Sequence, residues 1–120
     1  IFMAFEELEA LRYLHYLSPQ PTIFLNEQRL SPPSVSLGNQ DYPEKISEVL
    51  SGRAKQFKGI PGRKLALQAG DGRAVNVVLL GTLSAILSIP EKVWTDNLLR
   101  RFSPKAAKIN LEAFRLGRRA

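Results

Sequence analysis

The longest apolar stretch of the chain, residues 73–89 (RAVNVVLLGTLSAILSI), has two different sides when it is wound as a helix. At 3.6 residues per turn, one side carries the bulky residues Val75, Val78, Leu79, Leu83 and Ile86. The other side carries the small residues Ala74, Gly81, Ser84, Ala85 and Ser88. A helix that is apolar all round is buried. The stretch is shorter than the roughly 20 apolar residues of a membrane span, so we expect no membrane partner. It predicts a central buried helix on which the other elements pack.

Gly81 lies in the interior of this predicted helix, where glycine costs about 1 kcal/mol relative to alanine. The small side therefore predicts the close approach of another backbone, and we expect Gly81, Ser84 and Ala85 to form an interface with a second helix or subunit.

The N-terminal third of the chain alternates between strand and helix patterns. Residues 1–5 are a short apolar run and residues 22–26 are a second one, so both predict buried strands. Between them, residues 6–17 predict a helix whose first turn is acidic, as the helix dipole favours. Two strands joined through a helix predict a parallel pair.

The middle of the chain is less regular. Residues 27–42 predict a loop with a short extended piece at 34–36, and residues 43–50 predict a short helix. Residues 52–64 carry five bases and no acid, which predicts an exposed basic loop. Residues 64–69 predict a third strand that leads through a glycine turn into the central helix.

The last 30 residues predict helices. Ser88 and Glu91 have the spacing of a capping box, and Trp94, Leu98 and Phe102 recur every four residues. A final helix begins after Ser103 and Pro104, and we expect Gly117 to end it. Together the patterns predict a single α/β domain over residues 1–120, with a mainly parallel sheet and a helical C-terminal region.

Charge divides the 120 residues into two unlike parts. Residues 1–50 carry three bases against seven acids, and residues 51–120 carry 14 against four. A basic half of this kind suits an anionic partner, although runs of charge are more often a solvated surface.

Few residues could carry chemistry. The chain has no cysteine, so it offers no disulfide, thiol nucleophile or thiolate ligand, and we expect a cytoplasmic protein. His15 is the only histidine, and no nearby motif supplies a partner for it. We therefore expect no catalytic residue and no metal site in this chain.

The turn Gly70, Asp71, Gly72, Arg73 is the best candidate for binding a ligand. A glycine turn that leads into a helix directs free N–H groups and a partial positive charge at an anion, and Arg73 adds a formal charge. We therefore predict Gly70, Gly72 and Arg73 as an anion site, with an ordinary tight turn as the alternative.

Asn76 and Asn110 are polar residues on otherwise apolar predicted helices. Because buried amides must form hydrogen bonds, we expect each to hold a neighbouring loop or subunit, and we place both among the interface residues.

Four motifs in order carry a family likeness: AFEELEALR at 4–12, YPE at 42–44, NVVLLG at 76–81, and INLEAF at 109–114 followed by Gly117. With them the chain resembles the gamma-type subunit of 2-oxoacid:ferredoxin oxidoreductases, and within that family the small (beta) subunit of indolepyruvate ferredoxin oxidoreductases. The resemblance implies a three-layer Rossmann-like domain. The family's N-terminal strand and glycine-rich turn are missing here, so we expect a C-terminal part of such a subunit.

The resemblance also implies a function. Such an enzyme decarboxylates indolepyruvate or another aryl 2-oxoacid to an acyl-CoA and passes electrons to ferredoxin. Thiamine diphosphate and iron–sulfur clusters are expected in a large partner subunit, with this chain shaping assembly and active site without a redox centre. On this interpretation the anion site at Gly70, Gly72 and Arg73 would hold CoA. The alternative is a small basic module that binds nucleic acid or another polyanion, although we do not expect nucleic acid as the partner.

Overall fold

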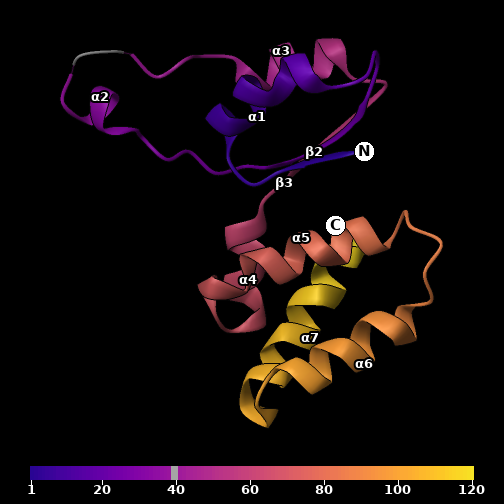
Figure 1. Ribbon diagram of the computed structural model, residues 1–120. Coiled ribbons are helices and arrows are strands. Elements are labelled where there is room, and N and C mark those ends of the chain that lie inside the picture. The colour runs from indigo at the N-terminus through magenta and orange to yellow at the C-terminus, as the bar shows by residue number, and fades with distance from the viewer. Residues whose placement is uncertain (39–40) are drawn as a thin grey trace. The chain divides into compact units, whose positions relative to one another are not determined.

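A computed structural model describes residues 1–38 and 41–120 of the chain (Figure 1). The chain forms two compact units, residues 1–60 and 61–120, and each is described by itself. The predicted loop at 27–42 includes residues 39 and 40, which lie outside the described residues. That one domain spans residues 1–120 stays a prediction.

The first unit is a three-stranded parallel sheet with helices. Its elements are β1 (Phe2–Ala4), α1 (Glu7–Tyr13), the 3-10 turn η1 (Leu14–Tyr16), β2 (Thr22–Asn26), α2 (Pro33–Ser36), α3 (Ile46–Arg53) and β3 (Gln56–Ile60). The strands lie in the order β1-β2-β3, with Ala4 opposite Leu25 and Leu25 opposite Gly59. The predicted parallel pairing of the first two strands is confirmed.

The core of this unit lies between the sheet and the helices α1 and α3, which run on the same side of the strands (Figure 1). It contains one apolar set from strands and helices, namely Ala4, Ala10, Ile23, Leu25, Ile46 and Leu50. The alternation of the strands and the spacing of Ile46 and Leu50 by one helical turn place these side chains on facing surfaces.

Two local predictions in the first unit are wrong, and a third element is displaced along the chain. The predicted basic loop contains β3, in which Gln56 and Lys58 are exposed while Ile60 is buried, as suits a strand at the edge of the described sheet. The extended piece at 34–36 lies in α2, where Pro33 suits the first helical turn. The helix predicted at 43–50 lies three residues later, as α3.

The second unit is helical. Its elements are α4 (Gly62–Ala69), the 3-10 turn η2 (Gly72–Ala74), α5 (Val75–Ser84), α6 (Glu91–Arg101) and α7 (Pro104–Arg119). Helix α7 packs against α4, α5 and α6 (Figure 1), and the predicted buried helix α5 packs mainly against α7 and α4. The predicted helix at 73–89 ends as α5 at Ser84, and Ile86 and Ile89 are exposed.

The strand predicted at 64–69 is helix α4. Leu65 and Leu67 alternate as in a strand, but Lys, Leu, Ala and Gln are strong helix formers. Gly70 ends the helix in the left-handed conformation at φ 113°, which glycine adopts without strain. The helix propensity of these residues and the helix end at Gly70 therefore outweigh the short alternation of apolar and polar positions.

Helices α5 and α7 meet through two glycines. A Cβ atom on Gly81 would overlap the carbonyl oxygen of Phe114, and one on Gly117 would overlap the carbonyl oxygen of Val78. The close approach predicted at Gly81 is thus confirmed, and α7 of the same chain makes it. Gly117 does not end its helix as predicted, because it lies inside α7 at this crossing.

The predicted α/β class with a parallel sheet and a helical C-terminal region is confirmed. The predicted capping box does not form, because α6 begins after Pro90 without a side-chain cap. No helix in the described ranges is long and apolar enough to cross a membrane.

Candidate functional site

A cavity of about 790 Å³ in the second unit lies where the helices α5 and α7 begin. It is lined by residues from η2, the first turn of α5 and the start of α7, namely Asp71, Arg73, Ala74, Asn76, Val77, Phe102, Ser103, Lys105, Ala106, Ile109 and Asn110. Three residues singled out in the sequence, Arg73, Asn76 and Asn110, therefore meet in one place. We name this cavity the α5–α7 pocket.

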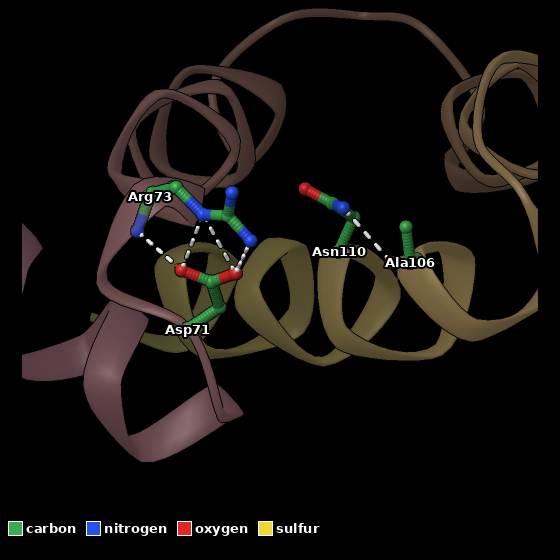
Figure 2. A network of polar contacts seen from close by, with 4 residues as sticks. All are labelled: Asp71, Arg73, Ala106 and Asn110. Atoms are coloured by element: carbon green, nitrogen blue, oxygen red, sulfur yellow. Dashed lines mark hydrogen bonds and ion pairs between the residues drawn. The ribbon is translucent and has the colours of Figure 1, made fainter.

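Asp71 and Arg73 form a closed pair at the edge of the pocket (Figure 2). Asp71 caps η2 by accepting the backbone N–H of Arg73 at 2.9 Å, and it accepts the Arg73 guanidinium at 2.7 Å. These side-chain and backbone hydrogen bonds from Arg73 lower the pKa of Asp71 to about 2. The predicted anion site required the backbone N–H and the guanidinium of Arg73, and both already donate hydrogen bonds to Asp71.

The two glycines of the predicted anion site lie at the ends of helical segments. Gly70 ends α4 and Gly72 begins η2, so the turn follows a helix and not the strand that was predicted. Binding of an anion by Gly70, Gly72 and Arg73 stays a prediction. It now requires that the anion compete with Asp71.

The two asparagines differ from each other. Asn110 is half-buried and donates its amide to the carbonyl of Ala106 in its own helix at 2.8 Å (Figure 2). Asn76 is exposed, so it is not the buried amide that the sequence predicted.

The predicted small side of α5 is partly covered within the chain. Ser84 is buried and donates its hydroxyl to the carbonyl of Gly81 at 2.6 Å, whereas Ala85 is exposed. The Arg118 guanidinium donates to the Ser84 carbonyl at 2.7 Å, and thereby binds the C-terminal end of α5. A subunit interface at Asn76, Gly81, Ser84, Ala85 and Asn110 stays a prediction, but Gly81 and Ser84 have their contacts inside this unit.

Lys105 is the cation of the pocket that the sequence did not single out. It lines the pocket, is exposed, and forms no ion pair within residues 1–38 and 41–120. Since Asp71 and Arg73 balance each other, Lys105 gives the pocket a net positive charge. The N-terminal ends of α5 and α7 add partial positive charge. The restart at Ser103 and Pro104 was visible in the sequence, but nothing there placed it beside the glycine turn.

A second polar cluster lies in the first unit, around Glu6. Its carboxylate is buried, accepts the Tyr42 hydroxyl at 2.7 Å, and caps α1 by accepting the Glu9 N–H at 2.9 Å. Burial raises the pKa of Glu6, but hydrogen bonds from Tyr42 and backbone N–H groups outweigh this and leave it below the usual value. Burial and the hydrogen bond to Glu6 raise the pKa of Tyr42. From the sequence we explained the acidic residues at the start of this helix by the helix dipole alone, which does not account for these contacts.

Comparison with known sequences decides the family. The profile of the pyruvate ferredoxin/flavodoxin oxidoreductase family matches residues 1–120, the whole chain. The chain belongs to this family. The resemblance predicted from four ordered motifs is thereby confirmed.

Curated relatives have one name in common, indolepyruvate oxidoreductase subunit IorB. The chain is 34% identical over 125 residues to the protein from Pyrococcus horikoshii and 35% identical over 127 residues to that from Thermococcus kodakarensis. Each alignment covers 100% of this chain and 62% of the relative. The protein from Archaeoglobus fulgidus is 30% identical over 98% of this chain and 60% of its own length. The chain therefore spans about three fifths of these relatives.

Proposed function

We propose that this chain is part of a subunit of an oxidoreductase that acts on indolepyruvate or a similar aryl 2-oxoacid. The observation that carries the proposal is the match of the whole chain to one oxidoreductase family, together with relatives that are all named as an indolepyruvate oxidoreductase subunit. The α/β fold with a parallel sheet agrees with the resemblance on which the prediction was based.

The reaction proposed for the whole enzyme is oxidative decarboxylation. The 2-oxoacid loses CO₂, its acyl group is transferred to the thiol of CoA, and the electrons pass to ferredoxin. Thiamine diphosphate and iron–sulfur clusters would lie in a large partner subunit. The sequence supports this division, because a chain without cysteine has no thiolate with which to hold a cluster. This chain would then shape the assembly and the active site.

The α5–α7 pocket is the place in this chain where CoA would bind. Phosphate groups bind where helix N-termini and basic side chains converge, and this pocket has the first turns of two helices and Lys105. The Asp71 carboxylate opposes an anion on one side of the pocket, so we assign the phosphate to the side of Ser103 and Lys105. Arg73 would bind the phosphate only after its ion pair with Asp71 had opened.

The experiment is to purify the protein from its source cells and assay the eluate. We expect a large partner to co-purify, and we expect reduction of a viologen dye that depends on CoA and on indolepyruvate, with phenylpyruvate and pyruvate as comparison substrates. Co-purification of nucleic acid, with binding that weakens steeply as salt rises, would instead support a polyanion-binding module. A partner without oxoacid-dependent dye reduction would refute the proposed activity.

A further inference from the structure

A hollow of about 470 Å³ lies in the first unit, between the segment that leads into β2 and the end of α3. One wall comes from η1 and the turn that follows it, and the other comes from Gly52 and Arg53 at the end of α3. The volume is within the roughly 300–1,000 Å³ that is typical of small-molecule sites. We name this cavity the η1–α3 hollow.

The two walls of the η1–α3 hollow are held together. The backbone N–H of Lys55, which follows α3, donates to the carbonyl of Pro21 at 2.9 Å. Leu14 and Leu17 pack against the apolar core of this unit. The hollow therefore exists before any ligand enters, as most small-molecule sites do.

Much of the lining is apolar. Leu14, Leu17, Pro19 and Pro21 all contribute to it. Proline has no backbone N–H, so the two prolines offer a ligand no backbone donor. Gly52 leaves room beside them, because a Cβ atom there would meet nothing within 4 Å. The lining thus suits the apolar body of a ligand.

Two polar side chains of the lining, His15 and Arg53, are available to a ligand. Both are exposed, and neither forms a hydrogen bond or an ion pair within residues 1–38 and 41–120. The His15 ring packs on the Tyr16 ring, with their centroids 3.9 Å apart. No carboxylate is among the lining residues, so Arg53 gives the hollow a positive charge.

These features describe the ligand. A guanidinium binds a carboxylate through two parallel hydrogen bonds. A single arginine balances one negative charge, which favours a carboxylate over a doubly charged phosphate. The imidazole ring of His15 and the proline rings present flat faces, and flat faces suit an aromatic ring.

We propose that the η1–α3 hollow binds an aryl carboxylate, a molecule with one carboxylate on an aromatic body. The carboxylate pairs with Arg53, and the ring lies against His15 and the apolar lining. The inference rests on this hollow alone and does not depend on the proposed function. The hollow belongs to the first unit, whereas the α5–α7 pocket belongs to the second.

The only histidine of the chain makes the η1–α3 hollow directly observable. In protein without a histidine tag, the imidazole C–H protons of His15 give one set of NMR resonances, and phenylacetate is titrated in at constant pH. We expect these resonances to shift and to reach saturation. Phenylacetamide, which has the same ring without the charge, should leave them unchanged.

Three results of this titration would overturn the proposal. They are the absence of a saturable shift with phenylacetate, equal affinity for phenylacetamide, and tighter binding of phenyl phosphate, which carries a second negative charge. The last result would mean that the hollow selects phosphate groups instead of carboxylates.

A variant of Arg53 tests the charge. Arg53→Gln should weaken phenylacetate binding by about tenfold or more, because hydrogen bonds between charged groups are lost. Arg12→Gln is the matched control, since Arg12 is also an exposed arginine in the last turn of its helix and does not line the hollow. Equal weakening by the two variants would contradict the proposed pairing.

Variants of Gly52 test the space. Gly52→Leu should fill the hollow and abolish binding of phenylacetate, whereas the smaller change Gly52→Ala should leave most of the binding. Circular dichroism and thermal melts check that each variant is folded. Unchanged binding by folded Gly52→Leu would place the ligand elsewhere and refute the proposal.

Discussion

Gly81 and Gly117 lie where α5 and α7 cross, and each glycine faces a backbone carbonyl of the other helix. Gly81 faces Phe114, and Gly117 faces Val78. The crossing is strengthened by Thr82, which donates its hydroxyl to the Gly117 carbonyl at 2.9 Å. The helices thus pack through their backbones, and any side chain at either glycine must push them apart.

Alanine at either glycine should destabilise the second unit. Alanine favours a helix over glycine by about 1 kcal/mol, but overlap with a backbone carbonyl cannot be relieved by a change of rotamer. We expect Gly81→Ala and Gly117→Ala each to lower the free energy of unfolding by at least about 2 kcal/mol. Urea denaturation measures this change. The double variant should cost less than the sum, because separating the helices once relieves both overlaps.

Gly52→Ala is the matched control for these glycine variants. Gly52 lies in α3, and a Cβ atom there would meet open space, so alanine should be neutral or stabilising by up to about 1 kcal/mol. Equal destabilisation by Gly52→Ala and Gly81→Ala would contradict the close crossing.

Arg118 joins three helices and should matter more than an ordinary surface arginine. It donates to the Ser84 carbonyl at the end of α5, and it pairs with Glu91 of α6 at 3.1 Å. Arg118→Met should lower the free energy of unfolding by about 1–2 kcal/mol, because the carbonyl and hydroxyl of the buried Ser84 lose a charged donor. Arg115→Met, in the same helix but exposed, should change it little. Thermal denaturation compares the two, and equal effects would refute this role.

The Glu6 carboxylate should make the first unit sensitive to acid. Its pKa is lower in the folded chain than in the unfolded one, so the unfolded chain binds more protons in that range. The stability that Glu6 contributes is therefore present above the ordinary glutamate pKa and is lost as pH falls through the lowered value. Tyr42→Phe should cost about 1.5–3 kcal/mol at neutral pH and make the acid transition shallower. Denaturation at several pH values measures both; an unchanged acid slope would contradict this.

Lys105 should contribute to CoA binding if the α5–α7 pocket holds a CoA phosphate. In the assembled enzyme, Lys105→Ala should raise the apparent KM for CoA by about threefold to tenfold and leave that for the oxoacid unchanged. Arg73→Ala should raise it less, because Arg73 is already paired with Asp71. Lys108→Ala, three residues further along α7 and outside the pocket lining, is the control. Steady-state kinetics with varied CoA tests this. An unchanged KM for CoA in Lys105→Ala would refute CoA binding in the pocket.

The strands that could be predicted were β1 and β2, which are mostly apolar in sequence. Residues 22–26 read as a continuous apolar run because β2 is the middle strand of the described sheet, and the structure gives the same bounds. The edge strand β3 was missed, since its exposed positions carry Lys58 and Gln56 and resemble a loop. Helix α4 was missed because six residues are too few to separate a period of 2 from one of 3.6.

For the candidate site, the sequence could predict parts but not their meeting. Gly81 was recognised from the cost of glycine in a helix, whereas its partner Gly117 looked like a helix end. Asp71 was treated as a turn residue, although it is the carboxylate that binds Arg73. The position of Lys105 beside that turn depends on the packing of α7 on α5, a contact between residues far apart in the sequence.

The most direct test of the proposed function is to add this protein back to the separately purified large subunit and measure viologen reduction with indolepyruvate and CoA. We predict that the large subunit alone is nearly inactive, that adding this protein restores the rate with a saturable dependence on its concentration, and that the rate requires both substrates. The same rate with and without this protein would contradict its role as a subunit of that enzyme.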